Sequence, residues 1–290
     1  MSRSMKWFVV VIAVAVVGYL GGRWALGTAP VPAEAANPLP LEAWRALART
    51  GAERPQSVER ILVAEGEFPA FAVIAGRPLT ARQRMVFQTH VLRYASGRTL
   101  VIDPVHDEAL HRELFGDGFD NEGWEAMQQA LADAWMVLAT HEHVDHVAGI
   151  ARSPHFDDIA GRVRLTQEQL DSPFIHDATF SAAQLERLVP MDYQDAYSPA
   201  PGVVLAKAPG HSPGSQWIFV TLENGTEYLF AGDVAWAHAN IDEGRGRARL
   251  VSALFLDEDQ HQVADQLAAL AALRDSPVRI IVSHDEPGVP

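Results

Sequence analysis

Three histidines and an aspartate stand within six residues in the stretch Thr140–Ile150, THEHVDHVAGI. His141 and His143 lie two residues apart at the end of an apolar, strand-like run. On an extended chain both side chains leave on the same side, so they can bind one ion together. Asp145 and His146 follow where the chain turns into a helix, which directs them to a second position close by. This stretch therefore predicts ligands for two metal ions.

Three further potential ligands each follow an apolar, strand-like run later in the chain. His211 lies in the turn PGHSPG, Asp233 ends the run FAGD, and His284 ends the run IIVSH. Loops at the C-terminal ends of strands gather along one edge of a sheet, where binding sites commonly form. A solvated histidine-rich loop is the alternative interpretation of the first cluster, but it leaves these three residues unexplained.

The composition of the chain excludes several kinds of site and ligand. The 290 residues are 48% hydrophobic, which is enough for one large domain. The chain has no cysteine, so disulfides, thiolate ligands and a cysteine nucleophile are excluded. The formal net charge of −14 provides no basic field for phosphate backbones, and we expect no nucleic-acid ligand.

Together the motifs resemble those of the metallo-β-lactamase fold superfamily. The principal signature of that family, His-x-His-x-Asp-His, is matched by residues 141–146, and PGHSPGS, GD and SHD match its later motifs in order. The run TLVIDP resembles the strand that opens the pattern, with Asp103 as the first aspartate. The resemblance covers residues 67–286 and implies an α/β fold, a four-layer αβ/βα sandwich with metal ions in the cleft between its sheets.

The resemblance also implies which residues bind each ion. It implies three ligands for the first ion, three for the second and one bridging carboxylate: His141, His143 and His211, then Asp145, His146 and His284, and finally Asp233. Nitrogen and oxygen ligands suit Zn²⁺ and also accept Mn²⁺ or Fe. Two ions lower the pKa of a shared water, so a bridging hydroxide is the implied nucleophile. Asp145 and Asp233 are the implied catalytic residues, and Asp103 is expected to support the ligands from behind.

Three residues are candidates for the substrate pocket. Trp236 stands three residues after Asp233, where lactone-hydrolysing members of the family often place a tyrosine. His238 follows on the same stretch, and Tyr193 precedes His211 on a possible substrate loop. For His238 solvent exposure is the alternative, and for Tyr193 simple packing.

The N-terminal segment predicts a membrane anchor. Residues 7–26 are apolar except for Arg23, and twenty residues at about 1.5 Å each span roughly the 30 Å of a hydrocarbon core. The basic Arg3 and Lys6 keep residues 1–6 in the cytoplasm, so we expect the rest of the chain outside it, periplasmic or extracellular. Cleavage as a signal peptide, followed by secretion, is the alternative.

Beyond the anchor, prolines in residues 27–40 predict an extended linker, and residues 41–290 are expected to form the hydrolase domain. Hydrophobic patterning predicts helices at 41–50, 121–134 and 258–274. It predicts strands at 71–76, 85–94, 98–104, 135–140, 202–210, 216–222, 226–234 and 278–284. Strands followed by a helix, twice over, predict two sheet-and-helix halves packed as a sandwich.

The predicted function is a membrane-tethered, extracytoplasmic hydrolase of a small acyl substrate, with an ester, lactone or thioester bond. Asp233 favours this prediction over β-lactam hydrolysis, because β-lactamases of the family tend to lack the bridging aspartate. A β-lactamase remains an alternative. So does a non-hydrolytic protein on the same fold, either a metal-binding module or a redox di-iron centre.

Overall fold

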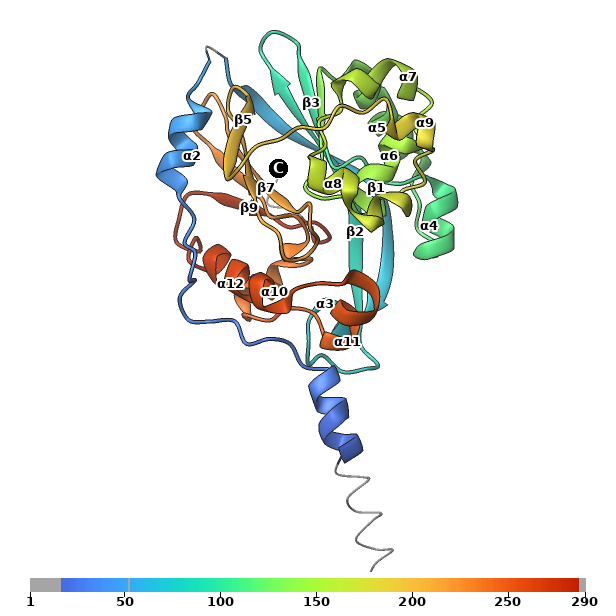
Figure 1. Cartoon of the computed structure of the whole chain (residues 1–290), viewed down its shortest axis with the longest axis vertical. Coiled ribbons are helices and arrows are strands. Elements are labelled where there is room, and N and C mark those ends of the chain that lie inside the picture. The colour runs from blue at the N-terminus through green and yellow to red at the C-terminus, as the bar shows by residue number, and fades with distance from the viewer. Residues whose placement is uncertain (1–16, 52, 287–290) are drawn as a thin grey trace, which may run out of the picture.

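Two β-sheets face each other in the protein, and helices cover the outer face of each (Figure 1). The computed structural model describes residues 17–51 and 53–286. The first sheet consists, in spatial order, of β1 (Pro55–Pro69), β2 (Arg82–Tyr94), β3 (Thr99–Ile102) and β4 (Met136–Leu138). The second consists of β5 (Ala196–Ala200), β6 (Val203–Lys207), β7 (Gln216–Thr221), β8 (Glu227–Phe230) and β9 (Arg279–Ile281).

Strand direction in the second sheet places several strand ends together. β7 is antiparallel to both β6 and β8, and β9 is parallel to β8. β6, β8 and β9 therefore all point the same way, and the loops that follow them leave from one edge of the sheet. In the first sheet β3 and β4 are parallel, so their following loops also start side by side.

Alternating side chains along the strands build two separate cores. On β6, Val203 and Leu205 point into the core between the sheets, whereas Val204 and Ala206 point to the helices outside. All four are buried, so both faces of this strand are covered. A sheet buried on both faces requires a helical layer on its outer side, which the chain supplies.

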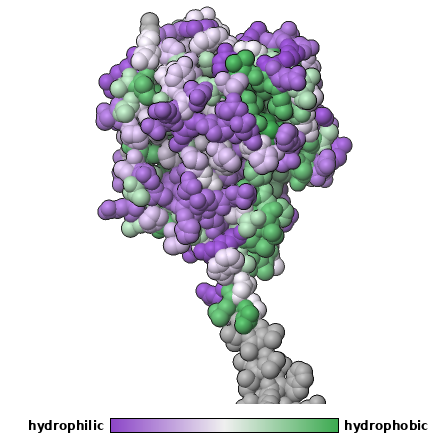
Figure 2. All heavy atoms as spheres, in the orientation of Figure 1, coloured by the Kyte–Doolittle hydropathy of each residue, from purple (hydrophilic) through white to green (hydrophobic). Residues whose placement is uncertain are grey.

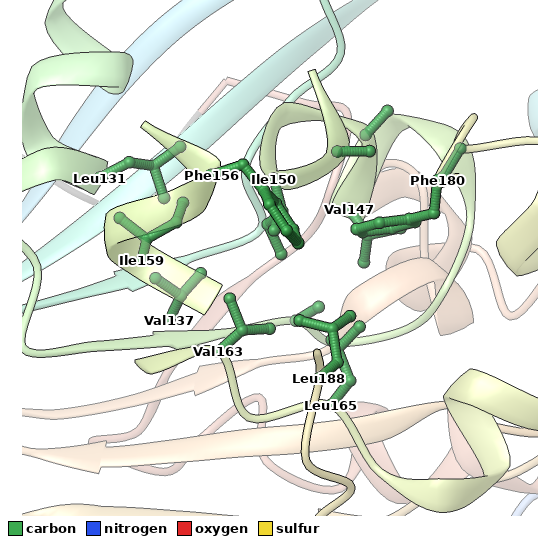
Figure 3. Packing of buried hydrophobic residues seen from close by; sticks show 14 of the residues in the cluster. Leu131, Val137, Val147, Ile150, Phe156, Ile159, Val163, Leu165, Phe180 and Leu188 are labelled. Carbon is green, nitrogen blue, oxygen red and sulfur yellow. The ribbon is translucent and has the colours of Figure 1, made fainter. Parts of the chain in front are cut away.

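Helices α5 (Asn121–Asp133), α6 (Val144–Ala151) and α7 (Phe156–Ile159) cover the first sheet. Their apolar residues pack in one buried cluster with β4; for example, Leu131 lies near Val137 in Figure 3. The helices α2 (Leu41–Ala48) and α12 (Gln260–Ala271) cover the second sheet. Shorter α-helices are α3 (Ala70–Val73), α4 (Glu108–Leu114), α8 (Gln167–Asp171), α9 (Ala182–Leu185), α10 (His238–Asp242) and α11 (Arg249–Val251). The four layers are those of the predicted αβ/βα sandwich.

Trp44 ties α2 to the second sheet. It is 3% exposed, and its ring centroid lies 6.0 Å from that of Trp217 and 5.9 Å from that of Phe219. Replacing Trp44 with alanine is expected to lower the free energy of unfolding by about 3–5 kcal/mol, because the change leaves a large cavity. Denaturant titration measures this, with Leu79→Ala at a 62% exposed position as a control that should change it by less than about 0.5 kcal/mol.

The structure corrects two strand predictions. Residues 71–76, predicted as a strand, begin in the one-turn helix α3, and an apolar run alone does not distinguish the two. The strand β1 was not predicted, although it is 15 residues long and pairs with β2 over its whole length. It is the edge strand of the first sheet, so its exposed side carries glutamates that hide the apolar pattern.

The predicted membrane-spanning helix is the wrong part of the fold prediction. Residues 1–16, which include half of the predicted span, lie outside the described residues, and residues 17–25 are helical. In the part of the chain that the structure describes, no helix has the length and apolar character needed to cross a membrane. The extracytoplasmic location stays a prediction.

The proline-rich segment 27–40 runs along the outer face of α12 (Figure 1). Ala29 is buried, and the backbone N–H groups of Ala36 and Asn37 donate to the Asp265 carboxylate. These contacts lead the chain from the N-terminal helix to α2 on the second sheet.

Candidate metal centre

All seven predicted ligands lie where strands of the two sheets end. His141 and His143 follow β4, and Asp145 and His146 lie in the first turn of α6. The other three follow the C-terminal ends of β6, β8 and β9, which point to the same edge of the second sheet: His211, Asp233 and His284. Because both groups of loops meet in the cleft between the sheets, ligands as far apart in the sequence as Asp145 and His284 become neighbours.

The first group consists of four buried side chains whose ligand atoms all lie within 4.8 Å of one another: His141, His143, His211 and Asp233. His211 Nε2 lies 3.0 Å from His143 Nδ1 and 3.3 Å from Asp233 Oδ2. His141 Nε2 lies 3.6 Å from the same carboxylate oxygen.

The second group consists of Asp145, His146 and His284. His284 Nε2 lies 3.4 Å from Asp145 Oδ2, and His146 Nε2 lies 3.7 Å from it. Asp233 again contributes, but with its other oxygen: Oδ1 lies 3.3 Å from His146 Nε2 and 3.4 Å from His284 Nε2. The two oxygens of Asp233 therefore face one group each.

These distances fit metal coordination. Ligand atoms about 2.0–2.1 Å from a tetrahedral ion lie about 3.3 Å from one another, and the separations given above lie between 3.0 and 3.7 Å. Several of these buried atoms have no hydrogen-bond partner, namely His141 Nε2, His146 Nε2 and Asp233 Oδ1. Unpaired buried polar atoms are costly unless something binds them. Two cations would satisfy them together.

The electrostatics of the site also suit cations. Burial lowers the pKa of His141 and His143 well below the usual range, so both imidazoles are in the neutral form that metal binding requires. Burial also acts against a charged His146, but nearby carboxylates, led by Asp145, raise its pKa well above the usual range. Burial alone would raise the pKa of Asp233, yet the surrounding imidazoles hold it well below the usual range. The second group thus has an excess of negative charge that a cation would neutralise.

Groups behind the ligands orient them. Asp103 Oδ2 lies 3.1 Å from His146 Nδ1, and this carboxylate also accepts from the backbone N–H and hydroxyl of Thr140 at 2.6 and 2.9 Å. The carbonyl of Val86 lies 3.0 Å from His284 Nδ1. An acceptor at Nδ1 leaves the Nε2 lone pair free for an ion. Asp103 thus lies where the sequence predicted, behind the ligands.

An apolar cavity of about 550 Å³ opens above the ligands. His143, Asp145, Asp233 and His284 lie in its floor, and Trp236 lines its side. Its walls come from the end of β1, from α3 and from the segment 250–256: Phe68, Phe71, Ala72, Leu250, Val251, Phe255 and Leu256. Figure 2 shows hydrophobic residues gathered on the flank where α3 and α11 lie. The volume is that of a typical small-molecule site.

The predicted pocket residues do not all reach this cavity. Trp236 does, and its Nε1 donates to Asp233 Oδ2 at 2.6 Å. His238 lies at the start of α10 with its backbone N–H on Asp285, and it does not line the cavity. Tyr193 donates its hydroxyl to Gln216 and packs against the core between the sheets, also away from the cavity. Sequence proximity to a ligand did not decide which side chains face the substrate.

Sequence reasoning missed the segment 247–258. Leu250 and Phe255 form part of the cavity wall, and the buried Arg247 and Glu258 stand at its two ends next to His211. The exposed apolar residues of the run RLVSALFL are the signal that could have identified the wall. No sequence pattern pairs an arginine with a glutamate 11 residues away.

The fold and the ligands can be compared with known proteins. Residues 98–284, well over half of the chain, match the beta-lactamase superfamily domain. No curated protein sequence matches the chain.

Several solved structures share the fold. One is a quorum-quenching N-acyl homoserine lactone lactonase, with 16% identity, a TM-score of 0.61, and coverage of 80% of this chain and 93% of that one. A probable metal-dependent hydrolase from Staphylococcus aureus has 16% identity, a TM-score of 0.61, and coverage of 80% and 91%. A dizinc quorum-quenching lactonase has 14% identity, a TM-score of 0.58, and coverage of 81% and 90%. The family match, together with this fold, confirms the predicted superfamily: the chain belongs to the beta-lactamase superfamily.

Proposed function

We propose that this protein is a dinuclear metal-dependent hydrolase of an acyl bond, in an ester, lactone or thioester, whose acyl group is apolar. The observation that carries the proposal is the position of Asp233. Its two oxygens face two separate ligand groups, and it lies at the floor of an apolar cavity. A carboxylate in this position can hold two cations close together under a bound substrate.

The cavity favours a neutral, apolar substrate. None of the described residues that line it is lysine or arginine, and Asp145, Asp177 and Asp233 are its acidic members. A phosphodiester or another anionic substrate would find no cationic side chain there to balance its charge. An aliphatic or aromatic acyl group would instead bury its surface against the phenylalanine and leucine side chains of the walls.

The chain's own residues supply binding and orientation. Bound divalent cations would supply Lewis-acid polarisation of the carbonyl and an activated water. Asp145 faces the cavity from the second group, and the carboxylate oxygen that it does not use as a ligand would accept a hydrogen bond from that water. Trp236 holds Asp233 through its indole N–H, while the apolar walls exclude bulk water from the reacting bond.

The solved structures that share the fold support the proposal of an acyl hydrolase. Their descriptions include N-acyl homoserine lactone lactonases and a dizinc centre, and lactones are activated acyl compounds. On this basis, and because all seven candidate ligands are histidine or aspartate, we propose Zn²⁺ as the metal.

An acyl-chain series tests the proposal. With purified, zinc-loaded protein, we expect kcat/KM for p-nitrophenyl esters and for lactones to rise with acyl length by up to about fourfold per methylene, since each buried CH₂ contributes about 0.8 kcal/mol. Ala72→Phe, which fills part of the cavity wall, should reduce the rates for long chains and leave acetyl esters nearly unchanged.

β-Lactams and phosphodiesters serve as comparison substrates, and we expect little turnover of either. Efficient phosphodiester cleavage with no acyl substrate hydrolysed would refute the proposed reaction class. A flat acyl series that Ala72→Phe does not alter would show that the cavity does not bind the acyl group.

A further inference from the structure

Arg247 and Glu258 form an ion pair in the interior, beside the first ligand group. Arg247 is 0% exposed and the Glu258 side chain 1% exposed. Glu258 Oε2 accepts from Arg247 Nε at 2.9 Å and from Arg247 Nη2 as well. Burying two charges is expensive, and an apolar pair of similar volume is often as stable or more so. Stability alone therefore gives little reason for this pair.

The carboxylate of this pair also contacts a candidate metal ligand. Glu258 Oε2 lies 3.1 Å from His211 Nδ1. A carboxylate can only accept, so this contact requires the proton to be on Nδ1 and leaves the lone pair of Nε2 toward the first ligand group. Arg247 Nη2 lies 3.3 Å from the same nitrogen, but both are donors and do not bond to each other. Arg247 Nη2 donates to Glu258 Oε2, which also accepts from His211 Nδ1 and Arg247 Nε.

A second path leads from the same arginine to Asp233. The Arg247 guanidinium stacks over the Trp236 ring, 4.8 Å from its centroid, and Trp236 Nε1 donates to Asp233 Oδ2 at 2.6 Å. Asp233 Oδ2 in turn lies 3.3 Å from His211 Nε2. Five side chains thus form a closed ring, and two of them are ligands of the first group.

The ring also fixes the cavity wall. Arg247 and Glu258 stand at the two ends of the segment that carries Leu250 and Phe255. Ser252 donates to Glu258 Oε1 at 3.0 Å, and Gln260 donates to the Arg247 carbonyl at 2.9 Å. The apolar wall and His211 therefore share one anchor.

We propose that Glu258 is a positioning residue for the first metal ion: it sets the tautomer and direction of His211, and Arg247 balances its buried charge. This inference rests on the metal site of the proposed function but not on its substrate. Neither residue contacts the cations or the reacting bond.

Two double variants that differ in a single acceptor test the inference. Arg247→Met/Glu258→Gln removes both charges and keeps an oxygen that can accept from His211 Nδ1. Arg247→Met/Glu258→Met has nearly the same shape and no such acceptor. Neither leaves a buried charge without its partner, which makes both more suitable than Glu258→Gln alone.

The readout is metal binding without substrate. Co²⁺ is titrated into the metal-free full chain and followed by its visible absorption, with a competing chelator to set the free concentration. In the Met/Met variant we expect one of the two dissociation constants to rise about 10–100-fold, the usual effect of losing a hydrogen bond behind a ligand. The Met/Gln variant should stay within about threefold of the unmodified protein, because it keeps that hydrogen bond.

Glu227→Gln is the matched control. It removes the carboxylate of a different, largely buried ion pair, which Glu227 of β8 forms with Arg45 of α2 at 2.7 Å and which contacts neither ligand group. It should leave both Co²⁺ dissociation constants unchanged. Equal binding by the two double variants, whether both strong or both weak, would overturn the inference. If the unmodified protein binds Co²⁺ as expected but hydrolyses no acyl substrate, that result would instead count against the proposed function.

Discussion

Asp233→Asn is expected to lower kcat for acyl substrates about 10³-fold and to reduce the metal content below two ions per chain. The side chain serves both ligand groups, with Oδ2 facing His211 and Oδ1 facing His146. Asparagine keeps one oxygen, but its amide nitrogen is a donor and cannot bind a cation. The loss of about 4 kcal/mol of charge stabilisation corresponds to about three powers of ten in rate.

Steady-state kinetics and metal analysis of the same preparation measure the two effects. Asp242→Asn is the control, because this aspartate lies in the same half of the molecule with its side chain 67% exposed and belongs to neither ligand group. It should retain full rate and metal content. An Asp233→Asn protein that holds two ions and keeps its rate would show that the carboxylate does not bridge.

Removal of metal with a chelator is expected to abolish hydrolysis of every acyl substrate, and readdition of Zn²⁺ should restore it. The purified protein should contain close to two ions per chain, one for each ligand group. Without cations the buried nitrogen and oxygen atoms at the site have no partners, so the thermal midpoint should also fall. Metal analysis, activity and thermal unfolding of one sample before and after chelation test all three effects.

His143→Ala distinguishes the site from metals bound elsewhere on the chain. It removes one nitrogen of the first group, so the metal content should fall toward one ion. His261→Ala, an exposed histidine near the start of α12, should change nothing. Two ions retained in the His143 variant would contradict the ligand assignment.

The candidate ligands could be selected from the sequence because they come soon after apolar strands. His141, Asp233 and His284 come within a few residues of β4, β8 and β9, and strand ends are where loops meet. The same patterning predicted α5 and α12 to within a few residues, since a helix with one buried face repeats its apolar residues every three to four positions.

The predictions failed for β1, for α3 and for the membrane-spanning helix. β1 was missed because glutamates interrupt its apolar residues, and α3 was taken for a strand because a fully apolar run carries no period. The membrane helix was inferred from hydropathy, whereas the described part of that segment is a short helix that carries Arg23. In each case, the composition of a segment did not determine its conformation.

The sequence by itself determined the family, the sandwich of sheets and helices, and which seven side chains can bind metal. Only the tertiary structure decided which oxygen of Asp233 faces each ligand group and which side chains support the ligands. The orientation of the two Asp233 oxygens depends on Trp236, and that of His211 depends on Glu258 and Arg247. Such contacts join residues from separate loops and require atomic positions accurate to about half an ångström. Local patterns of apolar and polar residues carry no such information, because it arises only when the two sheets pack together.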